Sequence, residues 1–273
     1  MTSAQMTGPA QTRRFYGLSD LRLVGRQVYY EQLSFWLNPI GAIFTVGFPL
    51  VFLILLGASA GSSRVKILGN IKLIQYYVPG FVAFGVMSAC FTTLAIVLVN
   101  RREEGLLKRL RLSPLPAWAF LGAVFISTLL VAFVQVIVLL AVGRFGFGVH
   151  LPANLGAFVV AVVVGGLSFT ALGAAISTLI PNPDAAGPVT NVVFFVLLFL
   201  AGLWFPIKAG SGLAQFSSYF PIRHFILAVF APFNQAKGAS PWAWSDLRAV
   251  AIWGVAAAAF AIWRFRWAPR RNQ

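Results

Sequence analysis

The sequence is poor in charged residues and has a single cysteine. Only 10% of its 273 residues are charged, 59% are hydrophobic and the mean hydropathy is +0.83. Because a soluble domain carries about 25% charged residues, this composition excludes an ordinary soluble protein and predicts one that crosses a membrane several times. Cys90 lies inside an apolar run, and no second cysteine is available for an intrachain disulfide.

Motifs of several enzyme and binding classes are also missing. No Gly-x-x-x-x-Gly-Lys-Ser/Thr phosphate loop and no Gly-Lys dipeptide occur, so ATP hydrolysis cannot be placed in this chain. His150 and His224 are isolated on predicted outer loops, which indicates no metal site. Asp20, Asp184 and Asp246 lie near loops with no evident partner, so we expect no catalytic set and no enzyme activity.

The positive charge does not indicate nucleic-acid binding. The formal net charge is +15, but the 21 basic residues are scattered between apolar stretches. Because no soluble region carries a basic face, we assign this charge to membrane orientation and to contact with anionic membrane lipids, and expect no nucleic-acid partner.

Six stretches approach the roughly 20 apolar residues that cross a bilayer. They are Ile40–Ala58, Tyr77–Val99, Ala119–Val142, Leu155–Ile180, Val189–Phe205 and Leu247–Phe265. The predicted fold class is therefore an all-α integral membrane protein with six transmembrane helices. Small residues at four-residue spacing on the fourth stretch, such as Ala161 and Gly165, predict close helix packing.

Lysine and arginine predict the direction of insertion. The N-terminal segment, the connection between the second and third spans and the C-terminal tail together hold 13 basic residues, against 8 on the opposite side. The positive-inside rule then places both termini in the cytoplasm and the chain in the cytoplasmic membrane. We expect residues 1–17 to be a disordered cytoplasmic N-terminus and residues 266–273 a basic cytoplasmic tail.

An amphipathic pattern precedes the first span, between Leu18 and Trp36. Apolar residues recur there at helical spacing, and aromatic residues suit the membrane interface. The apolar positions are Leu21, Val24, Val28 and Phe35. We predict a helix that lies on the membrane; the alternative is an ordinary juxtamembrane linker.

The stretch from Leu213 to Phe233 is apolar but contains Pro221, Arg223 and His224. Proline breaks a helix, and the polar side chains oppose an ordinary crossing. We predict short re-entrant helices that dip into the outer leaflet between spans five and six, buried against protein. The alternative is a further span, which would carry charge.

A dense charged segment, Asn100 to Pro116, separates the second and third spans. If it is helical, Leu106, Leu107 and Leu110 fall within one arc. Such a short helix is marginal alone, and its leucines need something to bury them. Membrane head groups and a cleft in a cytoplasmic partner both fit the periodicity.

The segment Arg102-Glu-Glu-Gly-Leu-Leu-Lys-Arg-Leu-Arg-Leu-Ser-Pro-Leu-Pro116 resembles the signature of type-2 ABC exporter permeases, R-E-x-G-T-x-x-x-L-x-x-S-P-L. Three further elements resemble the family in the same order: Trp36-Leu-Asn-Pro39, Tyr77-Val-Pro-Gly80 and Ala201-Gly-Leu-Trp-Phe-Pro206. Leu106 replaces the usual threonine. The likeness covers Leu18 to about Phe265 and is nearest to drug-resistance exporters of the daunorubicin type.

This resemblance implies one type-2 ABC transmembrane domain over residues 18–265, paired with a second copy or a related permease and with two ATPase subunits. Leu18–Phe35 would be the interfacial connecting helix and Ile207–Phe233 the outer re-entrant helices. Residues 101–112 would form a cytoplasmic coupling helix. Its expected ATPase contacts are Arg101, Arg102, Glu103, Glu104, Gly105, Leu106, Leu107, Lys108, Arg109 and Leu110. The chain would bind no cofactor itself, with ATP and Mg held by the partner ATPase.

Ionisable side chains are missing from the predicted spans, which argues against proton or ion coupling. We place a possible pathway on the fifth span at Asn191, Phe194, Phe195 and Leu198. A mostly apolar path favours export of a hydrophobic or amphipathic molecule, either a drug or a lipid. A lipid-linked glycan, a cell-wall lipid and a non-transport membrane scaffold are the alternatives.

Overall fold

The computed structural model describes residues 18–60, 63–65, 71–104, 117–204, 210–234 and 240–264. Three predicted features lie outside these residues: the disordered N-terminus 1–17, the basic tail 266–273 and the coupling helix from Gly105 onward. The helix α1 (Leu18–Trp36) is described, but the side chain of Leu21 is not.

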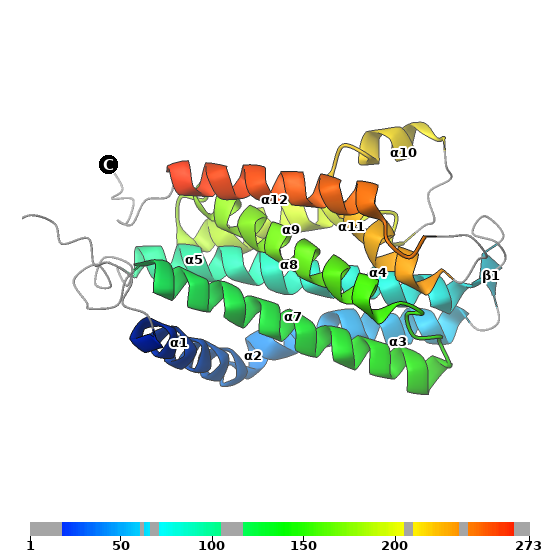
Figure 1. The fold of residues 1–273 in the computed structure, drawn as a ribbon, viewed down its shortest axis with the longest axis horizontal. Coiled ribbons are helices and arrows are strands. Elements are labelled where there is room, and N and C mark those ends of the chain that lie inside the picture. Colours follow the sequence, from blue (N-terminus) through cyan, green and yellow to red (C-terminus); the bar gives the residue numbers. More distant parts are fainter. Residues whose placement is uncertain are drawn as a thin grey trace, which may run out of the picture.

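Six helical segments in the described residues are long and apolar enough to cross a membrane, and they run along the long axis of the molecule (Figure 1). The first comprises α2 (Pro39–Ala42), the π-turn η1 (Ile43–Gly47) and α3 (Phe48–Ala60); the second comprises α4 (Leu73–Met87), the π-turn η3 (Ser88–Thr93) and α5 (Leu94–Glu103). The others are α7 (Ala117–Phe147), α8 (Leu155–Ser177), α9 (Pro183–Leu200) and α12 (Trp244–Arg264). The predicted all-α, six-span fold of a multi-pass membrane protein is confirmed.

Strands make only a minor contribution to the described part of the chain. β1 (Arg64–Val65) and β2 (Ile71–Lys72) form a short antiparallel pair between the first two spans, with Arg64 opposite Lys72. This pair lies at the end of the bundle away from the C-terminal turn of α12 (Figure 1).

The second and fifth spans begin and end at residues other than those predicted. The second span continues to Glu103, beyond the predicted end at Val99, so its helix enters the charged segment without a linker. The fifth begins at Pro183, because the side chain of Asn182 accepts a hydrogen bond from the Ala185 amide at 2.9 Å and caps the helix. It ends at Leu200, before Gly202, whose φ of 76° is the left-handed conformation that terminates helices.

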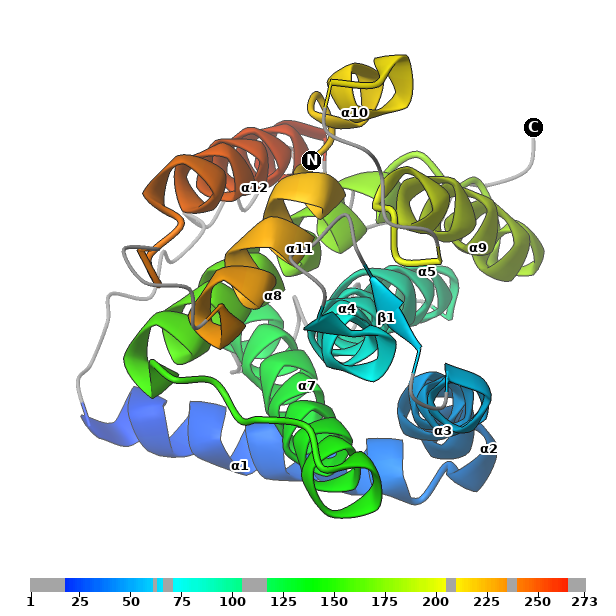
Figure 2. The ribbon, with the colours of Figure 1, turned by 90° about the vertical axis from the view of Figure 1, so that its right-hand side faces the viewer.

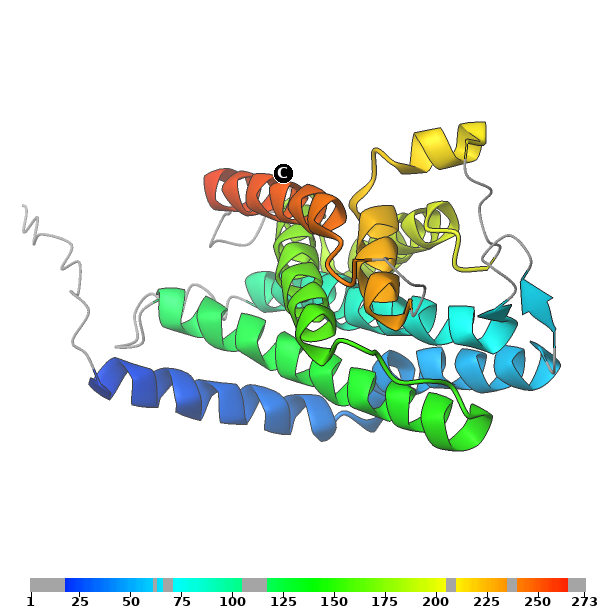
Figure 3. The same cartoon turned by 45° about the vertical axis from the view of Figure 1, so that its right-hand side comes forward.

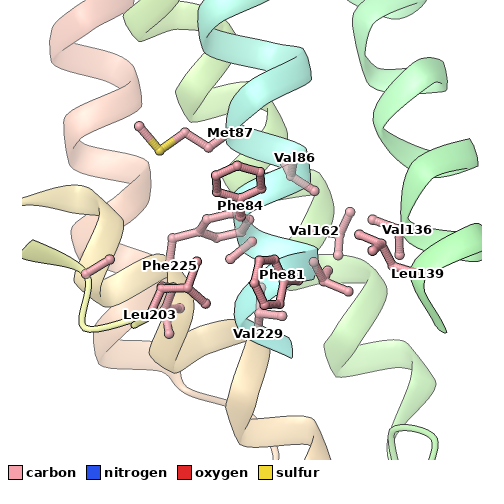
Figure 4. Close-up of a cluster of buried hydrophobic side chains, with 14 of the residues drawn as sticks. Phe81, Phe84, Val86, Met87, Val136, Leu139, Val162, Leu203, Phe225 and Val229 are labelled. Carbon is pink, nitrogen blue, oxygen red and sulfur yellow. The ribbon is translucent and has the colours of Figure 1, made fainter. Parts of the chain in front are cut away.

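The centre of the bundle is α4, which is buried along most of its length. Phe81, Phe84 and Met87 of this helix meet Phe225 from the short helix α11 (Pro221–Phe230) in one apolar cluster (Figure 4). Gly165 of α8 permits this approach, because a Cβ atom there would stand 1.9 Å from the Phe225 ring. The close packing expected from small residues on the fourth span is therefore confirmed.

Helix α1 lies across one end of the bundle, at a steep angle to most spans (Figure 2). It packs beside α7 (Figure 3), where the Gln32 side chain donates at 2.8 Å to the carbonyl and the hydroxyl of Ser127. Val24, Val28 and Phe35 are half-buried, whereas Tyr29 on the opposite face is 64% exposed. The helical extent is as predicted, and its location on a membrane surface stays a prediction.

Between the fifth and sixth spans the described residues form α10 (Gly212–Ser217), α11 and the 3-10 turn η4 (Ala231–Phe233). The apolar stretch Pro221–Phe233 is too short for a crossing, so the seven-span alternative is not supported. Pro221 begins α11 instead of breaking a longer helix. Short helices are thus present as predicted, and their re-entry into the outer leaflet stays a prediction.

The expectation that His224 and Asp246 have no partners is wrong. His224 Nδ1 lies 2.6 Å from Asp246 Oδ1, and its Nε2 lies 2.8 Å from the carbonyl oxygen of Ser218. The pair forms because α11 packs against the first turn of α12. It ties the segment between the last two spans to the start of the sixth.

Candidate functional site

A groove of about 520 Å³ lies between the first, second and fifth spans. The two π-turns face each other beside it, with the hydroxyls of Thr45 in η1 and Thr93 in η3 3.4 Å apart. A π-turn holds one more residue than an α-helical turn and is frequent at functional sites. Both threonines line the groove, so each irregular turn contributes a polar residue to it.

The lining of the groove combines amide, hydroxyl and aromatic side chains. Asn38 and Asn100 lie at the end that continues into the charged segment, whereas Asn191 lies three residues before Phe194, whose ring packs against Phe84 deeper in the second span. The other polar and aromatic lining residues are Phe44, Thr45, Phe48, Ser88, Thr92, Thr93 and Phe195. Among the described lining residues none is ionisable, so the groove offers neutral hydrogen-bonding groups and aromatic surface.

Three of the four predicted pathway residues line this groove. Asn191 and Phe195 are exposed. Phe194 is buried and packs against the second span, with the centre of its ring 5.2 Å from the centre of the Phe84 ring. The fourth, Leu198, is wholly buried in the core and does not line the groove.

The sequence did not predict the threonines of the first two spans as pathway residues. Thr45 and Thr92 line the groove from those spans. The hydroxyl of Thr92 is buried and has no hydrogen-bond partner among the described residues. Polar residues within the spans are the available signal, but their helical faces cannot be assigned without knowing which spans are neighbours.

A second polar cluster lies at the start of the charged segment. Arg101 donates to both carboxylate oxygens of Glu31 on α1, at 2.8 and 2.5 Å, and its guanidinium lies 5.4 Å from the centre of the Phe120 ring. Arg102, only 5% exposed, donates to the carbonyls of Ser177 and Ile180 at 3.1 and 2.8 Å.

The predicted ATPase contacts therefore divide into three groups. The guanidinium groups of Arg101 and Arg102 are engaged inside the chain, and Glu103 accepts from Arg102 at 2.8 Å. Glu104 is exposed. Gly105 to Leu110 lie outside the described residues. The ATPase contact itself stays a prediction for all of them.

The described residues contain no group of three His, Cys, Asp or Glu side chains that could hold a metal ion. The described residues combine six apolar spans with a groove that is lined by neutral side chains. This combination is typical of the membrane-embedded subunit of a transporter.

The chain belongs to the ABC-2 family of transporter proteins, whose family pattern matches residues 69–263. Membership supports a transmembrane subunit of a transporter. The family resemblance predicted from the charged segment is thus confirmed.

Two curated relatives are similar to the chain. The putative transport permease YvfS of Bacillus subtilis is 28% identical over 152 residues, which cover 55% of this chain and 62% of the relative. The probable multidrug ABC transporter permease YbhR of Escherichia coli K12 is 26% identical over 157 residues, 57% of this chain and 43% of the relative. The chain spans about half the length of the curated relatives it matches.

Proposed function

We propose that this chain is the membrane subunit of an ATP-driven exporter that moves a hydrophobic or amphipathic molecule, a drug or a lipid, out across the cytoplasmic membrane. The observation that carries the proposal is the groove between the first, second and fifth spans. Its volume of about 520 Å³ lies in the range of small-molecule sites.

The lining supports an amphipathic cargo. Asn38, Asn100 and Asn191 offer neutral donors and acceptors for a polar group, and the phenylalanine rings of the lining suit an apolar body. An ion would need charged or converging carbonyl ligands, which the described lining does not supply. The groove is also flanked by exposed apolar side chains, Phe44 at 67% and Phe195 at 51%. A lipid-soluble cargo therefore has a lateral route from the bilayer.

The energy source in this proposal is a pair of ATPase subunits that bind ATP and Mg and dock on the coupling helix. A second copy of this chain, or a related permease, completes the path. Both termini and the coupling helix are cytoplasmic. The multidrug name of the E. coli relative supports a drug-like cargo.

The test uses the permease co-expressed with its ATPase and reconstituted in vesicles, with a panel of neutral and cationic amphipathic dyes as cargo. Asn191→Leu and Phe195→Ala change groove side chains, while Val196→Ala, on the same helix, is a matched control at a 53% exposed residue that does not line the groove. We expect the groove variants to change dye-stimulated ATP hydrolysis and dye transport, and the control to leave both unchanged. Equal effects of all three substitutions would count against the groove as the cargo site.

A further inference from the structure

Arg101 and Arg102 are adjacent residues that anchor the end of the second span in two directions. Successive side chains on an α-helix point about 100° apart, so the two guanidinium groups leave α5 toward different neighbours. Arg101 reaches α1, and Arg102 reaches the turn between α8 and α9. Helix α5 ends at Glu103 and is capped by Glu104, inside the segment 101–112 that was predicted as the coupling helix.

The contact with α1 has a fixed geometry. Arg101 uses two donors on both oxygens of Glu31, and Gln27 donates to the same carboxylate at 2.9 Å. Exposed ion pairs contribute little, but here the side chains are only 17% and 9% exposed. A shielded, bidentate pair resists sliding and rotation. Helix α1 therefore cannot shift relative to the end of the second span without breaking it.

The contact with the α8–α9 turn uses the free end of a helix. The last carbonyls of α8 lack partners within the helix and carry the negative end of its dipole. Arg102 donates to Ser177 and Ile180 in this region, and a third carbonyl, that of Pro181, lies at 3.5 Å. A planar guanidinium can serve several carbonyls at once, which an ammonium group cannot do with the same geometry.

The contact between Arg102 and the α8–α9 turn lies next to the start of α9, a helix that lines the groove. Pro181 is followed by Asn182, which caps α9, and α9 carries Asn191 and Phe195. Arg102 thus joins the end of one groove-lining span to the beginning of another. Because the turn is held at its carbonyls, a displacement of α5 is passed to the first turn of α9.

We infer that Arg101 and Arg102 are positioning residues that couple the 105–116 loop to the groove. Movement imposed on this loop is passed through Arg101 to α1 and through Arg102 to α9, so the three helices move together at this end of the bundle. The part that concerns transport rests on the proposed function, because it takes the loop as the place where ATP-driven force enters. The mechanical connection of α5 to α1 and α9 does not depend on it.

The first experiment measures the connection without any partner. Hydrogen exchange is followed in the purified chain for wild type, Arg102→Lys and Arg102→Gln, with Arg26→Gln as a control at an exposed arginine of α1. We expect amides in the first turns of α9 to exchange at least about tenfold faster in both Arg102 variants, since local opening is controlled by such tertiary contacts. Unchanged exchange there in Arg102→Lys would overturn the inference.

The second experiment measures coupling in the reconstituted complex with its ATPase. We expect Arg102→Lys to assemble and hydrolyse ATP, while dye transported per ATP falls about tenfold, within the range of coupling energies between sites. Arg101→Glu and Glu31→Arg should each lower the same ratio, and the double exchange should restore at least half of it. A merely structural role predicts equal losses of hydrolysis and transport, and a double exchange that restores nothing would show that this pair does not make the connection.

Failure of the inference and failure of the proposed function give different results. A wild-type chain that binds no ATPase and moves no dye would refute the proposed function, while the exchange measurement would still decide the connection. A wild type that transports, beside Arg102→Lys with an unchanged ratio of dye to ATP, would refute the inference alone.

Discussion

The side-chain amide of Gln135, in the middle of α7, donates to the main-chain oxygen of Thr45 at 2.9 Å. Thr45 lies in the π-turn of the first span. Gln135 is fully buried, so the hydrogen bond is formed away from water. One polar side chain on the third span thus gives a hydrogen-bond donor to a main-chain carbonyl in the π-turn of the first span.

Replacing Gln135 with leucine should destabilise the protein. The Thr45 carbonyl would lose its donor, but the unpartnered Oε1 of Gln135 would also disappear, and this gain offsets part of the loss. We therefore expect a net cost of about 1 kcal/mol, at the low end of the effect for a buried unpaired group. Thermal unfolding in detergent measures it, with the exposed Gln215→Leu on α10 as the control. An unchanged Tm for Gln135→Leu would contradict the proposed role of this bond.

Gly165 should tolerate no larger residue. A Cβ atom there would stand 1.9 Å from Phe225, so alanine forces apart α8 and α11 in the centre of the core. We expect a loss of about 1–3 kcal/mol or failure to fold. Gly122→Ala on α7 is the matched control, because nothing lies within 4 Å of its Cβ position. That control should be neutral, or more stable by up to about 1 kcal/mol. Equal Tm shifts for both substitutions would show that the two helices are not packed as described.

Thr92 should affect the cargo more than the fold. Thr92 lines the groove, and its buried hydroxyl has no partner among the described residues, so valine removes no internal hydrogen bond. We expect unchanged stability. The apparent KM for dye transport should rise about fivefold, because the cargo loses one hydrogen bond worth about 1 kcal/mol.

Thr190→Val is the control for the Thr92 prediction. Thr190 is fully buried, donates to the Ala186 carbonyl at 2.5 Å and does not line the groove, so its replacement should lower Tm and leave KM unchanged. A Thr92→Val variant with lowered Tm and normal KM would show that its hydroxyl serves the fold.

The direction of insertion can be tested with single cysteines. Ser63 and Ser240 are exposed at the end of the bundle that the positive-inside rule places outside, and Glu104 is exposed at the other end. Cysteines at the two serines should react with an impermeant thiol reagent in intact cells, and a cysteine at Glu104 only after permeabilisation. The native Cys90 is fully buried, so the unmodified chain reports the background. Labelling at Glu104 in intact cells would reverse the orientation.

The charged segment shows how far sequence reasoning extends. Its composition and the R-E-x-G pattern were sufficient to recognise the family, and the helix of the second span does continue directly into it. The contacts of Arg101 and Arg102 inside the chain, however, were not predicted: both guanidinium groups bind other parts of this chain, and their contact with an ATPase stays a prediction. Nothing in the local sequence distinguishes an arginine that faces a partner from one that faces the neighbouring span.

The sequence by itself determined the six spans, the helix before them and the family, because hydropathy, helical periodicity and a contiguous motif are local properties. The tertiary structure alone decided which polar groups meet. Glu31 and Arg101 are 70 residues apart, Arg102 and Ile180 are 78 apart, and His224 and Asp246 are 22 apart. Each pairing depends on which helices pack together and on their rotation, and the apolar surfaces of six similar spans allow many such arrangements. The groove has the same origin, since its lining comes from three spans that only packing brings together.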